Sequence, residues 1–350
     1  MGYVPCVRAV TFQAPGEVRV EEKPEPTVGA PDEALVRVEA SGICGSDLHI
    51  FHGRVPVEPG FTIGHEFVGT VLALGEGVER VAVGDRVLGC FHVACATCAA
   101  CLRGDYHRCE HGRTFGHGSH LGDLQGAQAE QLLVPRANLT LRKVPEGVSD
   151  EVALFAGDVM GTGYHSIVHA GVQAGDTVAV LGLGPVGLCA VQAAGVAGAA
   201  RVFAVDSVAE RLAMAERFGA EPLHLTEQDP KRAVRSATEG RGVDVVVDAV
   251  GDPGPLAMAV SLCRDAGVVS GIGAYAGKGE VPLGLAWLKG LDLRLGLANV
   301  IAHVDRVLGL IEAGRLDPSP LVTHRLNLDE AARAYELYDA REALKVVLTP

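Results

Sequence analysis

The sequence has no excess of positive charge, because 30 Lys and Arg face 43 Asp and Glu and give a formal net charge of −13. Proteins that bind the phosphates of nucleic acids need basic patches, so the net negative charge argues against a nucleic-acid partner. The first 12 residues also lack the basic start and apolar stretch of a secretory signal. We therefore expect a cytoplasmic protein with reduced thiols.

Long hydrophobic runs are nearly absent as well. The exception, residues 178–200, carries no charge and is long enough to cross a membrane. It contains Pro185 and five glycines, however, and divides into a strand, a glycine-rich turn and a segment with helical spacing. A strand followed by a helix explains this pattern better, and we expect no membrane partner.

The 350 residues are enough for two domains, and no repeat or low-complexity linker separates them. Up to about residue 155 the pattern is one of short strands and turns. From about residue 175 apolar strands alternate with helical segments, which predicts an α/β domain with a doubly wound parallel sheet. The tail after residue 297 predicts two amphipathic helices and a last strand, and composition alone does not assign it to either domain.

Cysteine and histidine are concentrated in one region, since residues 44–120 hold six of the nine Cys and eight of the thirteen His. Within it lies Cys95-x2-Cys98-x2-Cys101-x7-Cys109. Four thiolates can surround one Zn²⁺ completely and leave no position for a substrate, so this motif predicts a structural zinc site. The alternatives are buried or disulfide-linked cysteines, or a zinc ribbon that binds nucleic acid, which the negative charge disfavours.

Two further candidate ligands are dispersed. Cys44 stands in Gly-Ile-Cys-Gly-Ser-Asp-Leu-His, and His65 stands in Gly-His-Glu. An open zinc site takes about three ligands of mixed type from separate loops, and these two residues fit that requirement. Each alone is a weak signal, because a lone Cys or His is more often a core or surface residue.

A dinucleotide motif follows the strand predicted at 178–181. It is Gly182-Leu183-Gly184-Pro185-Val186-Gly187, and it opens a predicted helix, the context that places a pyrophosphate at a helix N-terminus. Asp206 ends the next predicted strand, where a carboxylate accepts the ribose hydroxyls and repels a 2′-phosphate. NAD is therefore expected rather than NADP. Arg211 lies one helical turn later, either over the adenine or on a solvated helix face.

Together these segments resemble the zinc-containing medium-chain dehydrogenase/reductase family. Gly64-His65-Glu66-x2-Gly69-x5-Gly75-x2-Val78 matches its zinc signature, and the other motifs follow in the family's order from about residue 9 to residue 348. The resemblance implies a GroES-like catalytic domain, residues 1–155 and 298–350, with a zinc lobe at about 90–112. Residues 156–297 would form a Rossmann domain that binds NAD.

The resemblance also implies roles for single residues. Cys44, His65 and Asp158 would bind the catalytic zinc, with Glu66 as a further possible ligand; many members have Cys where this chain has Asp158, which could instead cap a helix. Asp47 would orient His65, and Ser46 and His49 would form a proton relay. Phe91 would line the substrate pocket. Thr162 would contact the nicotinamide side of the cofactor, and Lys345 its pyrophosphate. Phe91 could equally be a core aromatic.

The function implied is that of an alcohol dehydrogenase of bacterial type, with two zinc ions per chain, that transfers hydride between a small alcohol and NAD. The alternatives are a polyol, sugar or threonine dehydrogenase and a zinc-binding structural or regulatory protein without catalysis. A homo-oligomer is expected, a tetramer rather than a dimer, through the edge near residues 291–297. The remaining cysteines are expected in the core and four histidines on loops, namely Cys6, Cys90, Cys189 and Cys263, and His107, His111, His117 and His120.

Overall fold

The computed structural model describes residues 5–275 and 279–350, which form two compact units. Unit 1 contains the chain up to Asp158 and again from Asn299 onward, and unit 2 is the continuous segment Val159–Ala298. Unit 1 is therefore discontinuous in sequence, and unit 2 is inserted into it.

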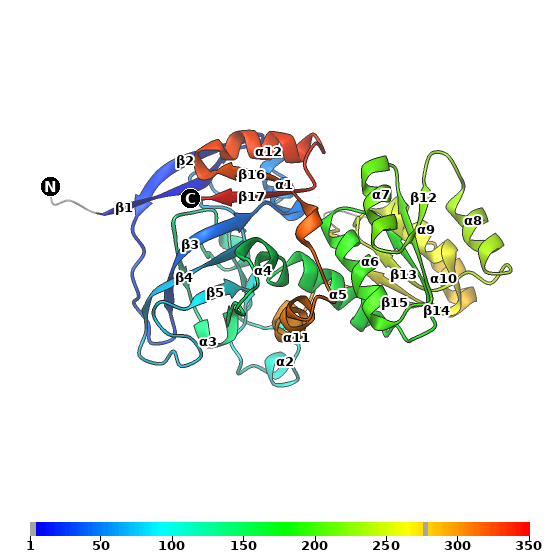
Figure 1. Ribbon diagram of the computed structural model, residues 1–350, viewed down its shortest axis with the longest axis horizontal. Helices are drawn as coiled ribbons and strands as arrows, with labels where there is room; N and C mark the ends of the chain where they lie inside the picture. The colour runs from blue at the N-terminus through cyan, green and yellow to red at the C-terminus, as the bar shows by residue number, and fades with distance from the viewer. Residues whose placement is uncertain (1–4, 276–278) are drawn as a thin grey trace. The chain divides into compact units, whose positions relative to one another are not determined.

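Unit 2 is built on a six-stranded sheet in which every neighbouring pair is parallel, as the alternation of apolar strands and helices predicted (Figure 1). The strand order is β12-β11-β10-β13-β14-β15, with bounds β10 Thr177–Leu181, β11 Arg201–Asp206, β12 Glu221–His224, β13 Val243–Asp248, β14 Cys263–Gly271 and β15 Asp292–Leu295. The helices are α5 Val159–Ala170, α6 Pro185–Ala197, α7 Ala209–Arg217, α8 Pro230–Ala237, α9 Pro253–Leu262 and α10 Leu283–Lys289. Every residue of the central strands β10 and β13 is buried. Neither strand shows the alternation of a half-exposed strand, and β13 is apolar except for Asp244 and Asp248.

Unit 1 contains a largely antiparallel sheet of seven strands. Its order is β16-β17-β3-β4-β5-β9, with β8 also paired to β3, and its bounds are β3 Ala34–Gly42, β4 Glu66–Leu74, β5 Arg86–Gly89, β8 Gln131–Val134, β9 Leu141–Lys143, β16 Val322–Asn327 and β17 Lys345–Thr349. Two strand pairs complete it, β1 Cys6–Ala14 with β2 Glu17–Pro24 and β6 His92–Val93 with β7 Arg113–Thr114. The tail thus belongs to unit 1, because β17 pairs with β3 (Figure 1).

The helices of unit 1 are short, except for the two in the tail. They are α1 Gly45–Phe51, α2 Ala99–Leu102, α3 Ala137–Thr140, α4 Asp150–Ala156, α11 Val300–Glu312 and α12 Ala331–Asp339, with 3₁₀ turns η1 Tyr106–Arg108, η2 Ser119–Leu121, η3 Ser319–Leu321 and η4 Leu328–Glu330. One hydrophobic cluster joins α1, the β1–β2 pair, α12 and β17, and includes Ile43, Phe51, Ile63 and Tyr335. This cluster fixes the segments that carry Cys44 and His65.

Several expectations about single segments are now decided. Residues 178–200 form β10, the glycine-rich turn and α6, and no helix in the described part of the chain is long and apolar enough to span a membrane. Cys6 was expected in the core and is exposed, because it begins the strand at the edge of the β1–β2 pair. His117 was expected on a loop surface and is buried, which the next section explains.

Candidate catalytic and metal sites

Two groups of side chains in unit 1 could each hold a metal ion. One consists of Cys95, Cys98, Cys101 and Cys109, and the other of Cys44, His65, Glu66 and Asp158. Within each group the potential ligand atoms lie within 4.8 Å of one another. The four cysteines grouped by one motif, and the four residues grouped by the family resemblance, are therefore each close together in space.

The four cysteines lie in the loop between β6 and β7, which also contains α2 and η1. The Sγ atoms of Cys95 and Cys101 are 4.0 Å apart, and those of Cys98 and Cys109 are 3.9 Å apart. A disulfide requires about 2.05 Å, so these cysteines are not paired, whereas a tetrahedron with bonds of about 2.3 Å separates its sulfurs by about 3.8 Å. The spacing fits one Zn²⁺.

Hydrogen bonds stabilise the charged form of two of these thiols, Cys95 and Cys98. The hydroxyl and N–H of Thr97 and the N–H of Cys98 donate to the Cys95 sulfur and lower the pKa of this thiol to about 5. The N–H of Cys95 donates to the sulfur of Cys109 at 3.2 Å, but burial outweighs this bond and raises the pKa of Cys109, as it does that of Cys101. Zinc binds thiolates rather than thiols, so Cys95 and Cys98 are prepared for a metal, and a bound cation would supply the positive charge that ionises the other two.

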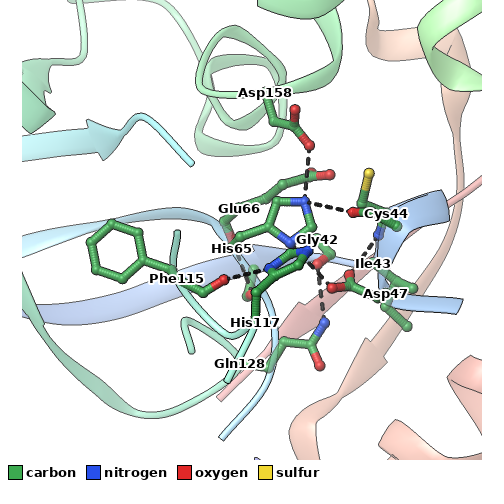
Figure 2. Close-up of polar contacts among 12 residues, drawn as sticks. Gly42, Ile43, Cys44, Asp47, His65, Glu66, Phe115, His117, Gln128 and Asp158 are labelled. Carbon is green, nitrogen blue, oxygen red and sulfur yellow. Dashed lines mark hydrogen bonds and ion pairs between the residues drawn. The ribbon is translucent and has the colours of Figure 1, made fainter. Parts of the chain in front are cut away.

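The second group combines sulfur, nitrogen and oxygen. Cys44 immediately precedes α1, His65 immediately precedes β4, and Asp158 follows α4. Figure 2 shows these three side chains directed toward one another. The Nε2 atom of His65 lies 3.1 Å from Oδ2 of Asp158, and Asp158 is buried.

Asp47 connects two of these candidate ligands. Its Oδ2 accepts the backbone N–H of Cys44 at 2.8 Å, and its Oδ1 lies 3.1 Å from Nδ1 of His65 (Figure 2). Asp47 has no exposed surface. A carboxylate on Nδ1 leaves Nε2 free as the ligand atom and fixes the plane of the ring, as is usual for histidines that bind metals.

The electrostatics of this group favour an added cation. Burial alone would lower the pKa of His65, but the charge of Asp47 and the hydrogen bond with Asp158 raise it well above its usual range. Burial and the neighbouring Asp158 carboxylate raise the pKa of the Cys44 thiol, so it stays protonated here. A divalent cation would supply the positive charge that lets this thiol ionise, and the donor set therefore fits zinc.

Glu66 is held by a lysine from the far end of the chain. Both side chains are fully buried, and Nζ of Lys345 contacts the Glu66 carboxylate and donates to the carbonyl of Ile43 at 3.1 Å. Burial raises the pKa of Glu66 to about 7. The family resemblance implied that Lys345 binds a pyrophosphate. In the structure its ammonium group pairs with the Glu66 carboxylate instead. Lys345 is the first residue of β17, and its side chain is buried inside unit 1.

Ser46 and His49 lie on α1 beside this group. The Ser46 hydroxyl is 3.3 Å from Nε2 of His65, and His49 follows three residues later, on the same face of the helix. Burial and the nearby charge of Arg54 lower the pKa of His49. Both side chains are partly exposed. Phe91 is buried with its ring 6.2 Å from that of His65.

His117 is part of this site, which the sequence analysis missed. Its ring lies 5.1 Å from the His65 ring, and its Nδ1–H donates to the carbonyl of Phe115 at 2.8 Å (Figure 2). Burial and the charge of His65 lower the pKa of His117 to about 4, so the ring is neutral. The flanking Gly116 and Gly118 have φ of +68° and +77°, a constraint that the Gly-His-Gly sequence could have suggested.

His92 is a second buried histidine, and neither ring nitrogen has a hydrogen-bond partner among the described residues. Burial lowers the pKa of His92 to about 3 in the folded protein, whereas a histidine in the unfolded chain has a pKa of about 6.5. Between these two pH values the unfolded chain binds a proton at His92 and the folded protein does not. Stability is therefore lost as the pH falls from about 6.5 toward 3.

Replacing His92 with Phe tests this effect. The unfolding free energy of the parent protein should fall between pH 7 and pH 5, and in His92→Phe this fall should be smaller by about 2 kcal/mol, as measured by urea titration at both pH values. An unchanged loss would mean that the folded protein protonates His92.

In unit 2 the glycine-rich motif joins β10 to α6. Gly182 has a φ of +82°, and a Cβ on Gly187 would lie 1.9 Å from the Gly182 carbonyl oxygen, so both positions require glycine. Gly184 precedes α6 and Pro185 is its first residue, followed by Val186. The backbone N–H groups at this helix start suit a phosphate.

Asp206 ends β11 next to this turn. Its Oδ2 accepts the N–H of Leu183 at 2.6 Å, and its Oδ1 accepts the N–H of Ser207 at 2.7 Å. Arg211, on α7, has a guanidinium nitrogen 3.9 Å from Oδ2 of Asp206. Thr162 is buried on α5.

Comparisons with known proteins agree with this architecture. Residues 30–146 match the alcohol dehydrogenase GroES-like domain, and residues 185–311 match the zinc-binding dehydrogenase domain. The "Probable zinc-binding alcohol dehydrogenase" of Mycobacterium tuberculosis is 39% identical over 348 residues, which cover 98% of this chain and 89% of that protein.

Solved structures give the same result. An alcohol dehydrogenase from Thermus sp. ATN1 is 47% identical, with a TM-score of 0.94 over 98% of this chain and 99% of that chain. The 2R,3R-butanediol dehydrogenase from Bacillus subtilis is 28% identical, with a TM-score of 0.84 over 98% and 99% of the two chains. The chain belongs to the zinc-containing medium-chain dehydrogenase/reductase family. The matched model of a zinc-binding dehydrogenase makes the chain an oxidoreductase of this family. Two similar solved structures, each 29% identical, are complexes with NADP and with NADH.

Proposed function

We propose that this protein is a zinc-dependent alcohol dehydrogenase that reversibly oxidises primary or secondary alcohols with NAD. The observation that supports this most strongly is the contrast between the two ligand groups. Four thiols form a closed set, whereas the second group offers Cys44, His65 and Asp158 as mixed ligands, together with a Glu66 carboxylate that is already paired with Lys345. Three mixed ligands leave a coordination position for a substrate, and four thiolates do not.

We call Cys44, His65, Glu66 and Asp158 the mixed group, and the metal site that they would form the mixed site. Zinc bound there would act as a Lewis acid and bring the pKa of a substrate hydroxyl toward neutrality. The residues of the chain have complementary tasks. Asp47 holds His65 in the orientation in which Nε2 faces the cation, and Cys44 and Asp158 supply negative charge. The Ser46 hydroxyl, 3.3 Å from Nε2 of His65, would accept the proton that the alcohol releases while giving up its own, and His49 on the same helix would be the group that releases a proton to solvent. Lys345 holds the Glu66 carboxylate, which would be available as an alternative ligand.

The NAD preference is proposed from Asp206, which stands beside the glycine-rich turn and would bind the ribose hydroxyls. Hydrogen bonds to a charged group contribute about 1.5–3 kcal/mol, so Asp206→Ala should weaken NADH binding by about 10- to 100-fold. Loss of the Asp206 carboxylate also removes the repulsion of a 2′-phosphate. The Kd for NADPH divided by the Kd for NADH, both measured by nicotinamide fluorescence, should therefore fall toward one.

Asp206→Asn is the matched control, because it keeps the shape of the side chain and an oxygen for the Leu183 N–H, while it loses the charge and the oxygen that accepts the Ser207 and Val208 N–H groups. It should narrow the same ratio with less damage to the turn. If both variants kept the cofactor ratio of the parent protein, Asp206 would have no part in choosing between the cofactors.

The substrate class is tested by following NADH production on zinc-loaded protein with simple primary, secondary and benzylic alcohols and with polyols, and then with NADP⁺. Turnover of simple alcohols with NAD⁺ is expected. A polyol dehydrogenase is the second candidate, because the butanediol dehydrogenase shares this fold and a sorbitol dehydrogenase is 32% identical over 345 residues. Activity on polyols alone would favour it, and no activity with two bound zincs would favour a non-catalytic zinc protein.

A homo-oligomer, and in particular a tetramer, is also proposed. β15 is an edge strand of its sheet, and exposed apolar side chains accompany it on and after α10, namely Leu283, Trp287, Leu288, Leu295 and Leu297. An apolar sheet edge of this kind is typically covered by a partner. A monomer in light scattering at micromolar concentration would contradict this proposal.

A further inference from the structure

We propose that Gln128 is a positioning residue of the mixed metal site, and that it sets the separation between Cys44 and His65 by bonding to one ligand segment while packing against the other. Tyr335 completes this arrangement by holding the Gln128 carboxamide. The inference rests on the proposed function, because it concerns how the ligands of the catalytic zinc are kept in place.

The carboxamide of Gln128 is bonded at both ends in the interior of unit 1. Its Nε2 donates to the Gly42 carbonyl at 3.2 Å, and its Oε1 accepts the Tyr335 hydroxyl at 3.0 Å. Gln128 and Tyr335 are fully buried. A carbonyl can only accept, so the amino end of the side chain must face Gly42 (Figure 2), and this fixes the orientation of the amide.

The contact with Gly42 acts on the segment that leads to Cys44. Side chains hold three consecutive residues there: Gln128 binds the Gly42 carbonyl, Lys345 binds the Ile43 carbonyl, and Asp47 binds the Cys44 N–H. A Cβ on Gly42 would lie 2.2 Å from the Glu66 carboxylate, so Gly42 cannot gain rigidity from a side chain of its own. The hydrogen bond from Gln128 restrains it instead.

The other side of Gln128 supports the residue before His65. Gly64 has a φ of +92°, and a Cβ on it would lie 2.4 Å from Cγ of Gln128. The backbone of the same segment adds two hydrogen bonds, from the Gln128 N–H to the Ile63 carbonyl at 3.1 Å and from the Ala127 N–H to the Gly64 carbonyl at 2.9 Å. Gln128 thus contacts both segments that deliver zinc ligands.

Tyr335 gives Gln128 a rigid partner. It lies on α12 in the tail of the chain, and its ring packs 5.4 Å from that of Phe51 at the end of α1. Burial raises the pKa of the Tyr335 hydroxyl well above its usual range, so it remains a neutral donor. Neither residue belongs to the ligand group, and both act through Gly42 and Gly64.

The test compares Gln128→Met, which keeps the length of the side chain and removes the amide, with the full-length zinc-loaded parent. Zinc transfer to a chromogenic chelator should show two phases, and the four-cysteine site serves as an internal reference. We expect the mixed site to lose zinc about 10-fold faster in Gln128→Met, the lower end of the range for groups bonded directly to a ligand, because Gln128 acts through the residues next to the ligands. The visible spectrum of the Co²⁺-loaded mixed site should also change, because it reports ligand geometry directly.

Two further variants separate positioning from general stability. Tyr335→Phe keeps the ring and removes only the hydroxyl, so it should act in the same direction with a smaller effect, and it keeps the test available if Gln128→Met folds poorly. Gln131→Met is the matched control, because Gln131 is a partly buried glutamine on the neighbouring β8 whose amide bonds to Glu25 at 2.8 Å. It should leave both zinc phases and the Co²⁺ spectrum as in the parent.

The outcomes distinguish the two hypotheses. If the parent binds two zincs while Gln128→Met and Tyr335→Phe keep its release rates and Co²⁺ spectrum, the positioning role is overturned and the proposed function stands. If the parent binds zinc only at the four cysteines, the proposed catalytic site itself is overturned. Equal acceleration of both phases in Gln128→Met and Gln131→Met would also overturn the positioning role, because it would reduce the effect to lost stability.

Discussion

Replacing Cys44 with alanine is expected to lower kcat/KM for alcohol oxidation by about 1,000-fold or more and to leave one zinc per chain. Cys44 is the one sulfur ligand of the mixed group, and its removal takes away a negative charge that the cation requires. Lewis-acid stabilisation of the reacting oxygen contributes several kcal/mol, and each ~1.4 kcal/mol corresponds to a factor of ten in rate. Steady-state kinetics and metal analysis of the purified variant measure both effects.

Cys90→Ala is the matched control for this experiment. The Cys90 thiol is also buried, and its surroundings raise its pKa to about 12, but it belongs to neither ligand group. This variant should keep two zincs and a kcat/KM close to that of the parent. If Cys44→Ala were as active as Cys90→Ala, the reaction would have to take place without the mixed group.

A Cys98→Ala variant is expected to fail in a different way. The segment from Cys95 to Cys109 contains only a four-residue helix and one 3₁₀ turn, and Leu102 within it is 76% exposed. Such a loop has little core of its own, and bound zinc contributes about 10 kcal/mol or more to the folding of small domains. We expect zinc to fall to one per chain and the unfolding temperature to drop by about 10 °C.

The order of events distinguishes this variant from Cys44→Ala. Activity in Cys98→Ala should decline together with structure on warming, as followed by circular dichroism and by assays at increasing temperature. Cys44→Ala should instead be inactive while fully folded. If Cys98→Ala retained two tightly bound zincs, the four-cysteine loop would not be a structural zinc site.

The parts of the molecule that sequence predicts well depend on local spacing. The parallel sheet of unit 2 is confirmed, because a strand buried on both faces lacks polar–apolar alternation, as the apolar run of β10 shows. The four cysteines lie within 15 positions of one another, so their spacing alone indicates that they can surround one ion. The glycine motif is similarly contained in one turn between a strand and a helix.

The contacts that sequence reasoning did not foresee act over long separations. Lys345 lies 279 positions from Glu66, and Tyr335 lies 207 positions from Gln128. No local pattern shows that a lysine at the start of a strand is buried or that a glutamine contacts two ligand segments. His117 could have been suspected only from its flanking glycines. These contacts depend on which segments the fold brings together, and spacing along the chain does not contain that information.

The insertion of unit 2 into unit 1 also determines when the mixed site can exist during synthesis. Cys44, Glu66 and Asp158 are made first, and the 140 residues Val159–Ala298 must follow before the tail that supplies Lys345 is begun. At about 5–20 residues per second this insertion takes roughly 7–30 seconds on the ribosome. Throughout that interval β3 lacks its neighbour β17, and Glu66 lacks its buried counter-ion. Unit 2, which is continuous, has all its strands before unit 1 does, so the metal site is among the last parts of the protein to be assembled.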